Sequence, residues 1–499
     1  MATPEEQITP ADAAIVTTGT GRKGPEEHDL PQNLKYDMDL CLKILRDVLG
    51  EYNPELLSTF DTVRNYSVEA SAEHFAELED PNPAQDGLKE AVNVIDNMTL
   101  HDAQLLARAF ATYFHLANLS EENYRVSVLH ERENNVSGEQ AVDPINELTV
   151  AYHQLINEMG PAKAKELLDQ LEFHPVFTAH PTEARRKAVE GKIRRISELL
   201  GEYKILGGSD KKECLRRLYN EIDALFRTSP IALKKPTPVE EADTILDIFD
   251  NTLFHTIPKV YRRFDDWILG DQAGLVEPVC PAFFHPGSWI GSDRDGNPNV
   301  TAKVSRAVAR KFSDHVIAAL EEATRTVGRN LTMEAETTPP SAELKNLWSH
   351  QKEMSERLTD KAALISTKEM HRAVMLVMAD RLHYTIERDA DLMYHSCDDF
   401  LNDLKVVQRS LAEAGAKRSA YGPLQDLIWQ TETFGFHMVE MEFRQHSVVH
   451  ARALADIREH GLHGERGELQ PMTHEVLDTF RALGAIQKRN GLKAARRYI

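Results

Sequence analysis

Cysteine is scarce in this chain, with four in 499 residues, and no two of the four stand close together in the sequence. Their wide spacing contains neither a paired metal-ligand pattern nor the dense framework of a disulfide-stabilised domain. A reduced, cytoplasmic environment therefore suits the chain best. The four residues are Cys41, Cys214, Cys280 and Cys397.

Long hydrophobic runs are missing as well. One of the most apolar stretches, AVMLVMA, begins at Ala373 and is far too short to cross a bilayer. The first residues, MATPEEQITPADAA, include acidic side chains and no apolar segment, so we expect no signal peptide. The sequence therefore predicts neither a membrane protein nor a secreted one.

Positive charge is in the minority, with 58 Lys and Arg against 79 Asp and Glu and a formal net charge of -21. This balance argues against general binding to nucleic acid or to anionic membranes. An anionic substrate would have to be met by a local group of cations. The chain is long enough to form a large core. Its length would suit about three domains, but a single large barrel can also contain this many residues.

The chain divides by composition into three regions. Residues 1–31 are rich in Thr, Ala, Gly, Pro and charge and predict a mobile leader. Across residues 32–171 apolar side chains recur at helical spacing, as at Cys41, Leu45 and Val48, and predict an N-terminal helical region. The third region, residues 172–499, contains the stretches whose side chains could take part in catalysis or binding.

Several long helices are predicted from periodicity. The segment 102–119 is nearly all apolar or small and predicts a buried helix, with Ser120 at the start of the next one. Later segments with helical periodicity and few breakers predict long helices over 302–326, 341–358 and 367–414.

The first chemical stretch, FHPVFTAHPTEARRKAVEGKIRR, runs from Phe173 to Arg195. An apolar strand is expected to end near Phe177, and a turn containing His180 leads into a basic helix. Pro181 disfavours helical geometry at His180, and Thr182 can cap the helix that follows. An imidazole beside cations and helix amides suits the handling of an anion, although a lone His in a Pro turn is more often structural.

The second chemical stretch, FHPGSWIGSDRDGNPNVT, covers residues 284–301. Its three glycines permit a tight backbone, and charged and amide side chains crowd one loop. An EF-hand is excluded because the spaced carboxylates and the terminal Glu of a calcium loop are absent. An Asx-rich turn with internal ion pairs stays open as the alternative to a functional loop. The crowded side chains are Asp293, Arg294, Asp295 and Asn297.

The third chemical stretch, FGFHMVEMEFRQHS, covers residues 434–447. Its alternation of apolar and polar residues predicts a strand, with Arg444 at the end of that strand. An Arg in that place suits a bidentate clamp on a phosphate or carboxylate. An Arg paired with Glu440 or Glu442 would be an equally ordinary structure.

Together these stretches resemble bacterial-type phosphoenolpyruvate carboxylase. TAHPTEARR resembles the first signature of that family, WIGSDRDGNPNVT the second, and the stretch around Arg444 its characteristic strand, all in the family's order. The resemblance runs from about Tyr36 to the last residue. Departures are Phe226 where a Trp is usual, Ser292 in place of a Gly, and Glu442 and Phe443 in place of Asp and Ile.

The resemblance implies a mainly α chain with a few parallel strands, in which residues 172–499 form the first part of a helix-elaborated (β/α)8 barrel that is incomplete here. It implies an enzyme that joins bicarbonate to phosphoenolpyruvate and yields oxaloacetate and phosphate, an anaplerotic supply for the tricarboxylic acid cycle. A cytoplasmic homotetramer is expected at full length, without nucleic acid or membrane partners. The family's later signatures do not occur in this sequence, so we expect an N-terminal part that is inactive alone.

Site residues also follow from the resemblance. His180 is expected to be catalytic, Arg444 to bind the substrate phosphate, and Arg294 to share that substrate-binding role. Mg²⁺ is the expected cofactor, with ligands beyond Ile499. A noncatalytic helical scaffold that binds a partner remains the alternative function, and the roles of Asp293, Asp295 and Asn297 stay open.

Overall fold

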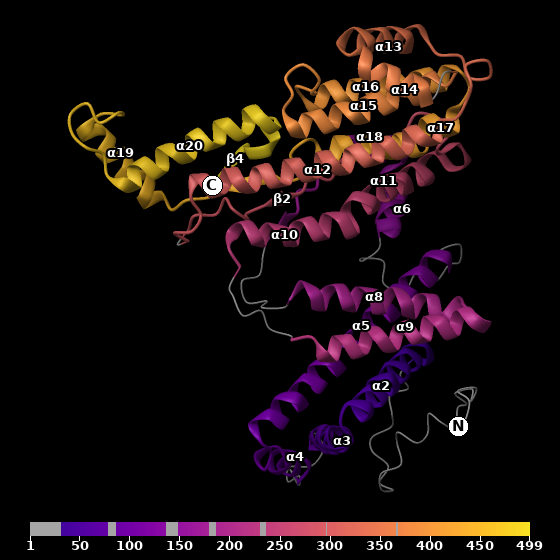
Figure 1. The fold of residues 1–499 in the computed structure, drawn as a ribbon, viewed down its shortest axis with the longest axis vertical. Helices are drawn as coiled ribbons and strands as arrows, with labels where there is room; N and C mark the ends of the chain where they lie inside the picture. Colours follow the sequence, from indigo (N-terminus) through magenta and orange to yellow (C-terminus); the bar gives the residue numbers. More distant parts are fainter. Residues whose placement is uncertain are drawn as a thin grey trace. The chain divides into compact units, whose positions relative to one another are not determined.

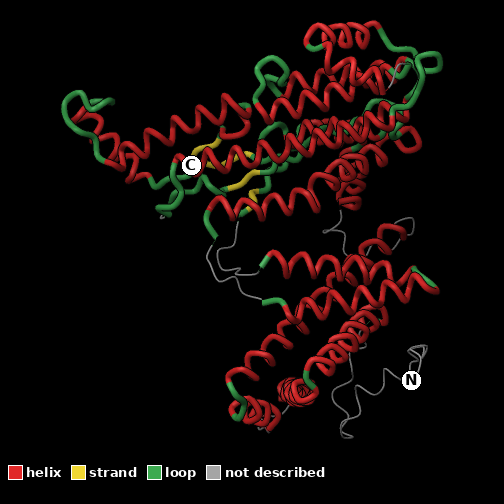
Figure 2. Tube along the Cα trace, viewed as in Figure 1, coloured by secondary structure: helices red, strands yellow, loops and turns green. Residues whose placement is uncertain are grey.

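The computed structural model describes residues 31–77, 86–135, 148–178, 186–229, 236–295, 297–365 and 368–499. The described chain is mainly helical with four short parallel strands (Figures 1 and 2). Backbone contacts divide it into two compact units, one of Met1–Asp143 with Thr182–Lys235 (unit 1) and one of Pro144–Pro181 with Pro236–Ile499 (unit 2). This grouping follows packing, whereas the sequence suggested the linear regions 32–171 and 172–499.

Unit 1 is helical throughout its described residues, and its helices share one apolar core. The helical spacing predicted at Cys41, Leu45 and Val48 is confirmed, because all three side chains are buried on one face of their helix. The second segment of the unit packs with the first, as α8 contacts α5 and α9 contacts α2 (Figure 1). The helices are α2 (Gln32–Tyr52), α3 (Pro54–Glu77), α4 (Asp86–Asp96), α5 (Leu100–Asn135), α8 (Lys187–Ile205) and α9 (Gly208–Arg227).

Helix α5 corrects one prediction from the sequence. No new helix begins at Ser120, because α5 continues through this position to Asn135. The Ser120 hydroxyl donates a hydrogen bond of 2.9 Å to the Leu116 carbonyl one turn earlier, so the side chain is satisfied inside the helix and does not cap it. The helix is also less buried than predicted, since Phe114 is 57% exposed.

Unit 2 contains the remaining helices, which surround the strands and share a second, larger core. No helix among the described residues has both the length and the apolar content that crossing a membrane requires. The longer helices are α6 (Leu148–Met159), α7 (Pro161–Asp169), α10 (Pro238–Ile248), α11 (Phe254–Leu269), α12 (Ala302–Asn330), α13 (Ala342–Met354), α14 (Glu356–Ile365), α15 (Met370–Glu387), α16 (Cys397–Glu413), α18 (Pro423–Phe434), α19 (Ser447–His460) and α20 (Pro471–Asn490). Short helical segments are η3 (Phe249–Leu253), η4 (Gly270–Gln272), α17 (Lys417–Tyr421) and η5 (Leu492–Ala495).

Two of the predicted long helices are interrupted. The segment 341–358 breaks at Ser355, which has an extended backbone between α13 and α14. The segment 367–414 forms α15 and α16, because Arg388 ends the first helix in the left-handed region at φ 64° and Ser396 caps the second. The helix predicted over 302–326 is confirmed as α12.

The sheet is short, parallel and ordered β1-β2-β3-β4. Successive strands are neighbours, with Gly287 of β2 opposite both Val176 of β1 and Glu440 of β3. Because side chains alternate along a strand, the sheet has two different faces. One face places Met441 and Phe443 in the apolar core, while the other carries charged side chains. The strands are β1 (Val176–Phe177), β2 (Gly287–Ser288), β3 (Glu440–Phe443) and β4 (Arg497–Tyr498).

Candidate functional site

The three chemical stretches of the sequence follow three adjacent parallel strands. His180 comes three residues after the end of β1, the loop with Asp293 follows β2, and Arg444 directly follows β3. The carboxyl ends of parallel strands meet at one edge of a sheet, which is where α/β proteins bind ligands. His180 itself lies outside the described residues, which end at Thr178 and resume at Arg186.

Arg444 is held at this edge by its backbone and its side chain. Its backbone N–H donates to the Ser292 carbonyl at 3.2 Å, and its carbonyl accepts from the Arg294 N–H at 3.0 Å. Its guanidinium makes a two-pronged pair with the Asp293 carboxylate, with Nε to Oδ1 at 3.1 Å and Nη2 to Oδ2 at 2.7 Å. The hydrogen bonds and charge of Asp293 raise the pKa of Arg444. This geometry is the one in which an Arg grips a carboxylate or a phosphate.

The guanidinium of Arg444 also lies on an aromatic face. Its central carbon is 4.7 Å from the centre of the Trp289 ring, a distance at which a cation is attracted to the ring's π electrons. The indole Nε1–H of Trp289 donates to Glu442 Oε2 at 2.8 Å. Trp289 therefore connects the carboxylate of one strand residue with the guanidinium that follows the same strand.

The two carboxylates of β3 do not pair with Arg444, which was the alternative left open by the sequence. Glu440 Oε2 accepts from Arg496 Nε at 3.0 Å, and Glu442 Oε1 accepts from Arg497 Nη1 at 3.0 Å. Arg497 continues the network, because its Nη2 lies 2.8 Å from His174 Nδ1. Both carboxylates are buried and paired with cations from residues 496 and 497; Glu442 uses both oxygens, whereas Glu440 Oε1 has no hydrogen-bond partner among the described residues.

Arg294 lies on the other face of the sheet from Arg444. Its side chain is 4% exposed and packs over the ring of Phe443, 5.3 Å from the ring centre. Its Nη1 donates to the Ser292 carbonyl at 3.2 Å and its Nη2 to Ser305 Oγ at 2.8 Å. Burial lowers the pKa of Arg294. Because Phe443 and Arg444 are consecutive in an extended chain, the structure does not bring the two guanidinium groups together.

The loop after β2 contains the Asx turns that the sequence left open. Asp293 Oδ1 accepts from the Asp295 N–H at 3.0 Å, and Asn297 Oδ1 accepts from the Asn299 N–H at 3.1 Å. Ser292, which stands where the family usually has Gly, is buried and donates to the Ser288 carbonyl at 3.4 Å.

Gly291 fixes this loop against α12. Its φ is 71°, and an added Cβ would lie 2.6 Å from Cγ2 of Val308. Only glycine tolerates both the left-handed backbone and the close approach.

Sequence reasoning missed the roles of Trp289 and Glu442. The available signal was the spacing of Glu440, Glu442 and Arg444, which a strand places on one face. Arg497 could not be assigned as their partner, because its proximity depends on the pairing of β3 with β4.

A metal centre does not emerge from this part of the chain. Within the described ranges, no three His, Cys, Asp or Glu side chains are grouped so that they could hold a metal ion. Glu440 and Glu442 pair with Arg496 and Arg497 instead.

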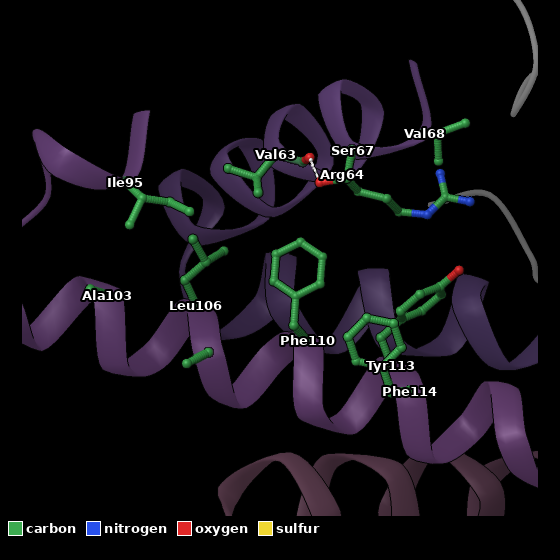
Figure 3. Close-up of a pocket in the computed structure, with 11 residues that line it drawn as sticks. Val63, Arg64, Ser67, Val68, Ile95, Ala103, Leu106, Phe110, Tyr113 and Phe114 are labelled. Carbon is green, nitrogen blue, oxygen red and sulfur yellow. Dashed lines mark hydrogen bonds between the residues drawn. The ribbon is translucent and has the colours of Figure 1, made fainter. Parts of the chain in front are cut away.

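A separate cavity of about 500 Å³ lies in unit 1, between α3, α4 and α5 (Figure 3). Its walls are mostly apolar and aromatic, and Phe110, Tyr113 and Phe114 line it from α5. The Ser67 hydroxyl at its edge donates to the Val63 carbonyl at 2.8 Å. This lining lacks the paired charged groups found at the ends of the strands.

Comparison with known proteins agrees with the motifs. The family model described as Phosphoenolpyruvate carboxylase matches residues 34–462. The phosphoenolpyruvate carboxylase of Roseiflexus castenholzii is 32% identical over 437 residues, which cover 79% of this chain and 46% of the relative. The phosphoenolpyruvate carboxylase of Phaseolus vulgaris is 29% identical over 462 residues, covering 86% and 45%. The chain spans about half the length of the curated relatives it matches. It belongs to the phosphoenolpyruvate carboxylase family.

Proposed function

We propose that this chain supplies the phosphate-binding part of a phosphoenolpyruvate carboxylase, which converts phosphoenolpyruvate and bicarbonate to oxaloacetate and phosphate. Family membership supports the reaction, and the placement of Arg444 at the ends of parallel strands is the observation that carries the assignment. Because the chain spans about half of its relatives, the complete activity requires the part of the family that it does not match. Residues 1–499 alone form no oxaloacetate.

Arg444 is the proposed phosphate clamp. Its planar fork already holds the two oxygens of Asp293, and a phosphoryl group offers oxygens in the same geometry. During phosphoryl transfer the fork can follow charge as it moves between oxygens. Lys, a point charge without the fork, is a poor substitute. Arg294 makes buried contacts with Ser305 and Phe443. We therefore propose that it supports the loop and does not contact the substrate directly.

His180 is the proposed catalytic residue. In the reaction, phosphoenolpyruvate passes its phosphoryl group to bicarbonate, and the resulting carboxyphosphate releases carbon dioxide, which carboxylates the enolate. An imidazole can donate a hydrogen bond to the anionic carboxyphosphate and manage a proton near neutral pH. In the sequence His180 follows β1 by three residues, and β1 is the neighbour of β2, the strand before Asp293, which supports this proposal.

The remaining features of the enzyme are proposed from the family. The sequential parallel strands with intervening helices support a (β/α)8 barrel of which this sheet is the first part. Mg²⁺ would neutralise negative charge on the reacting oxygens when bound. Within the described residues no group of three His, Cys, Asp or Glu could hold it; we propose that its ligands lie in the part of the family that this chain does not match, and no step here is assigned to it. The complete enzyme is proposed to be a cytoplasmic homotetramer.

The test is to measure oxaloacetate formation by a full-length form carrying Arg444→Lys or His180→Asn. Arg444→Lys is expected to raise the phosphoenolpyruvate KM or cut kcat at least about ten-fold, because the two-pronged grip is lost. His180→Asn is expected to bind phosphoenolpyruvate normally and lose carboxylation. Wild-type kinetics for either variant would remove that residue from the proposed mechanism.

A further inference from the structure

We infer that Glu442 is a positioning residue for the phosphate clamp, Arg444, and that it acts on Arg444 through the indole of Trp289. This inference rests on the proposed function, since it concerns how Arg444 is prepared to hold a phosphate. Glu442 need not touch the substrate. Its carboxylate sets the orientation and electron density of the ring on which the guanidinium lies.

Trp289 contacts both Glu442 and Arg444. The indole N–H donates to Glu442 Oε2 at 2.8 Å, and the face of the same ring lies 4.7 Å from the guanidinium carbon of Arg444. A carboxylate that accepts from the indole N–H pushes negative charge into the ring. The ring then attracts the guanidinium more strongly than an unbonded indole would.

Glu442 is itself fixed by burial and by a second hydrogen bond. Its side chain is 7% exposed, and Arg497 Nη1 donates to its other oxygen at 3.0 Å. Gly287 on β2 lies beside this carboxylate, since a Cβ added there would be in ordinary van der Waals contact with Glu442 Oε1 at 3.6 Å. The carboxylate is therefore held between two strands and a ring, with both oxygens in use.

Glu440 provides a comparison that distinguishes this role from the burial of a charge alone. Glu440, two residues earlier on the same strand face, is also buried, but its hydrogen-bond partner is Arg496. Within the described residues it has no hydrogen bond to Trp289. Both glutamates lie near Arg497, whose Nη2 is 3.6 Å from Glu440 Oε2, but only Glu442 is hydrogen-bonded to Trp289.

The experiment uses the chain of residues 1–499 and titrates phosphoenolpyruvate by calorimetry. Glu442→Gln keeps the side-chain size and removes the charge, and we expect it to weaken binding about ten-fold. Trp289→Phe keeps a ring and removes the N–H, and should weaken binding to a similar degree. The two changes together should cost little more than either alone, because both break one connection. Glu440→Gln is the control and should stay within about two-fold of wild type.

A second readout does not depend on binding. The chain has four tryptophans, so fluorotryptophan labelling gives a small set of fluorine resonances, and Trp289→Phe identifies the one from Trp289. Glu442→Gln and Arg444→Gln should each shift this resonance in the ligand-free protein, whereas Glu440→Gln should leave it in place. This readout also shows whether each variant is folded.

The outcomes are distinct. Unchanged binding in Glu442→Gln, with binding lost in Arg444→Gln, would overturn the role of Glu442 and leave the clamp standing. Equal weakening by Glu440→Gln would also overturn it, because any buried glutamate would then suffice. If Arg444→Gln binds phosphoenolpyruvate as wild type does, or if wild type does not bind it, the proposed clamp is itself wrong and the inference falls with it.

Discussion

His371 is buried in α15, only 2% exposed, and its Nε2 lies 2.9 Å from Ser410 Oγ. Burial lowers its pKa to about 4. The unfolded chain takes up a proton at His371 as the pH falls below about 6.5, while the folded chain resists until about 4, so stability is lost as the pH falls through that interval. Above this interval the imidazole is neutral in both states and contributes no pH dependence.

The corresponding prediction is that His371→Gln flattens the acid side of the stability profile. Between about pH 7.5 and about pH 5, wild type should lose about 2 kcal/mol more unfolding free energy than the variant. Chemical denaturation at both pH values measures this difference. Buried carboxyls with raised pKa, such as Asp403, have the opposite effect in both proteins and cancel. Parallel profiles for the two proteins would mean that folding leaves the pKa of His371 unchanged.

At the same scale, the sequence predicted the place of Arg444 but not its partner. Strand periodicity is local, so the end of β3 could be read from neighbouring residues. Asp293 lies 151 positions away in the chain, and only the parallel pairing of β2 with β3 brings the two side chains together. The four cysteines are free thiols in the structure.

Among the elements, α11 contains a proline that its neighbours accommodate. Pro258 has no N–H, so the carbonyl of Phe254 loses the hydrogen bond that a regular helix would provide. Gln430 of α18 supplies a replacement, because its Nε2 donates to this carbonyl at 2.8 Å. Both groups are buried, so the bond is worth more than one at the surface.

Gln430→Leu is therefore expected to destabilise the protein by about 1–3 kcal/mol, because it leaves the Phe254 carbonyl unpaired. In a Pro258→Ala background the restored N–H can bond that carbonyl, and the same substitution should cost clearly less. Unfolding free energies of the four proteins in this double-mutant cycle provide the measurement. Equal costs in both backgrounds would show that Gln430 does not compensate for the proline.

The sequence predicted which helices exist better than it predicted where they begin and end. Helix α12 could be predicted because its apolar residues recur at helical spacing with few helix-breaking residues. At Ser355 the backbone becomes extended although the sequence pattern around it stays helical. The strand β2 consists of Gly287 and Ser288, residues with low strand preference. Its conformation comes from hydrogen bonding to β1 and β3 on either side, which no local pattern reveals.

For the whole molecule, the division into two units could not be predicted from the order of the chain. Helices α8 and α9 follow β1 in sequence, yet they share a core with α2 and α5. Their apolar faces indicate that they pack against something, but periodicity does not name the partner. The family and its proposed reaction were readable because the three motifs are short, local and in order.

We propose above all that residues 1–499 carry the phosphate clamp and need the rest of the family's length for catalysis. The most direct measurement takes one purified sample of this chain and records two quantities: phosphoenolpyruvate binding, with Arg444→Gln as the comparison, and oxaloacetate formation with bicarbonate and Mg²⁺. The account predicts binding that depends on Arg444 and no oxaloacetate. Oxaloacetate formation by this chain alone, or binding that is indifferent to Arg444, would contradict it.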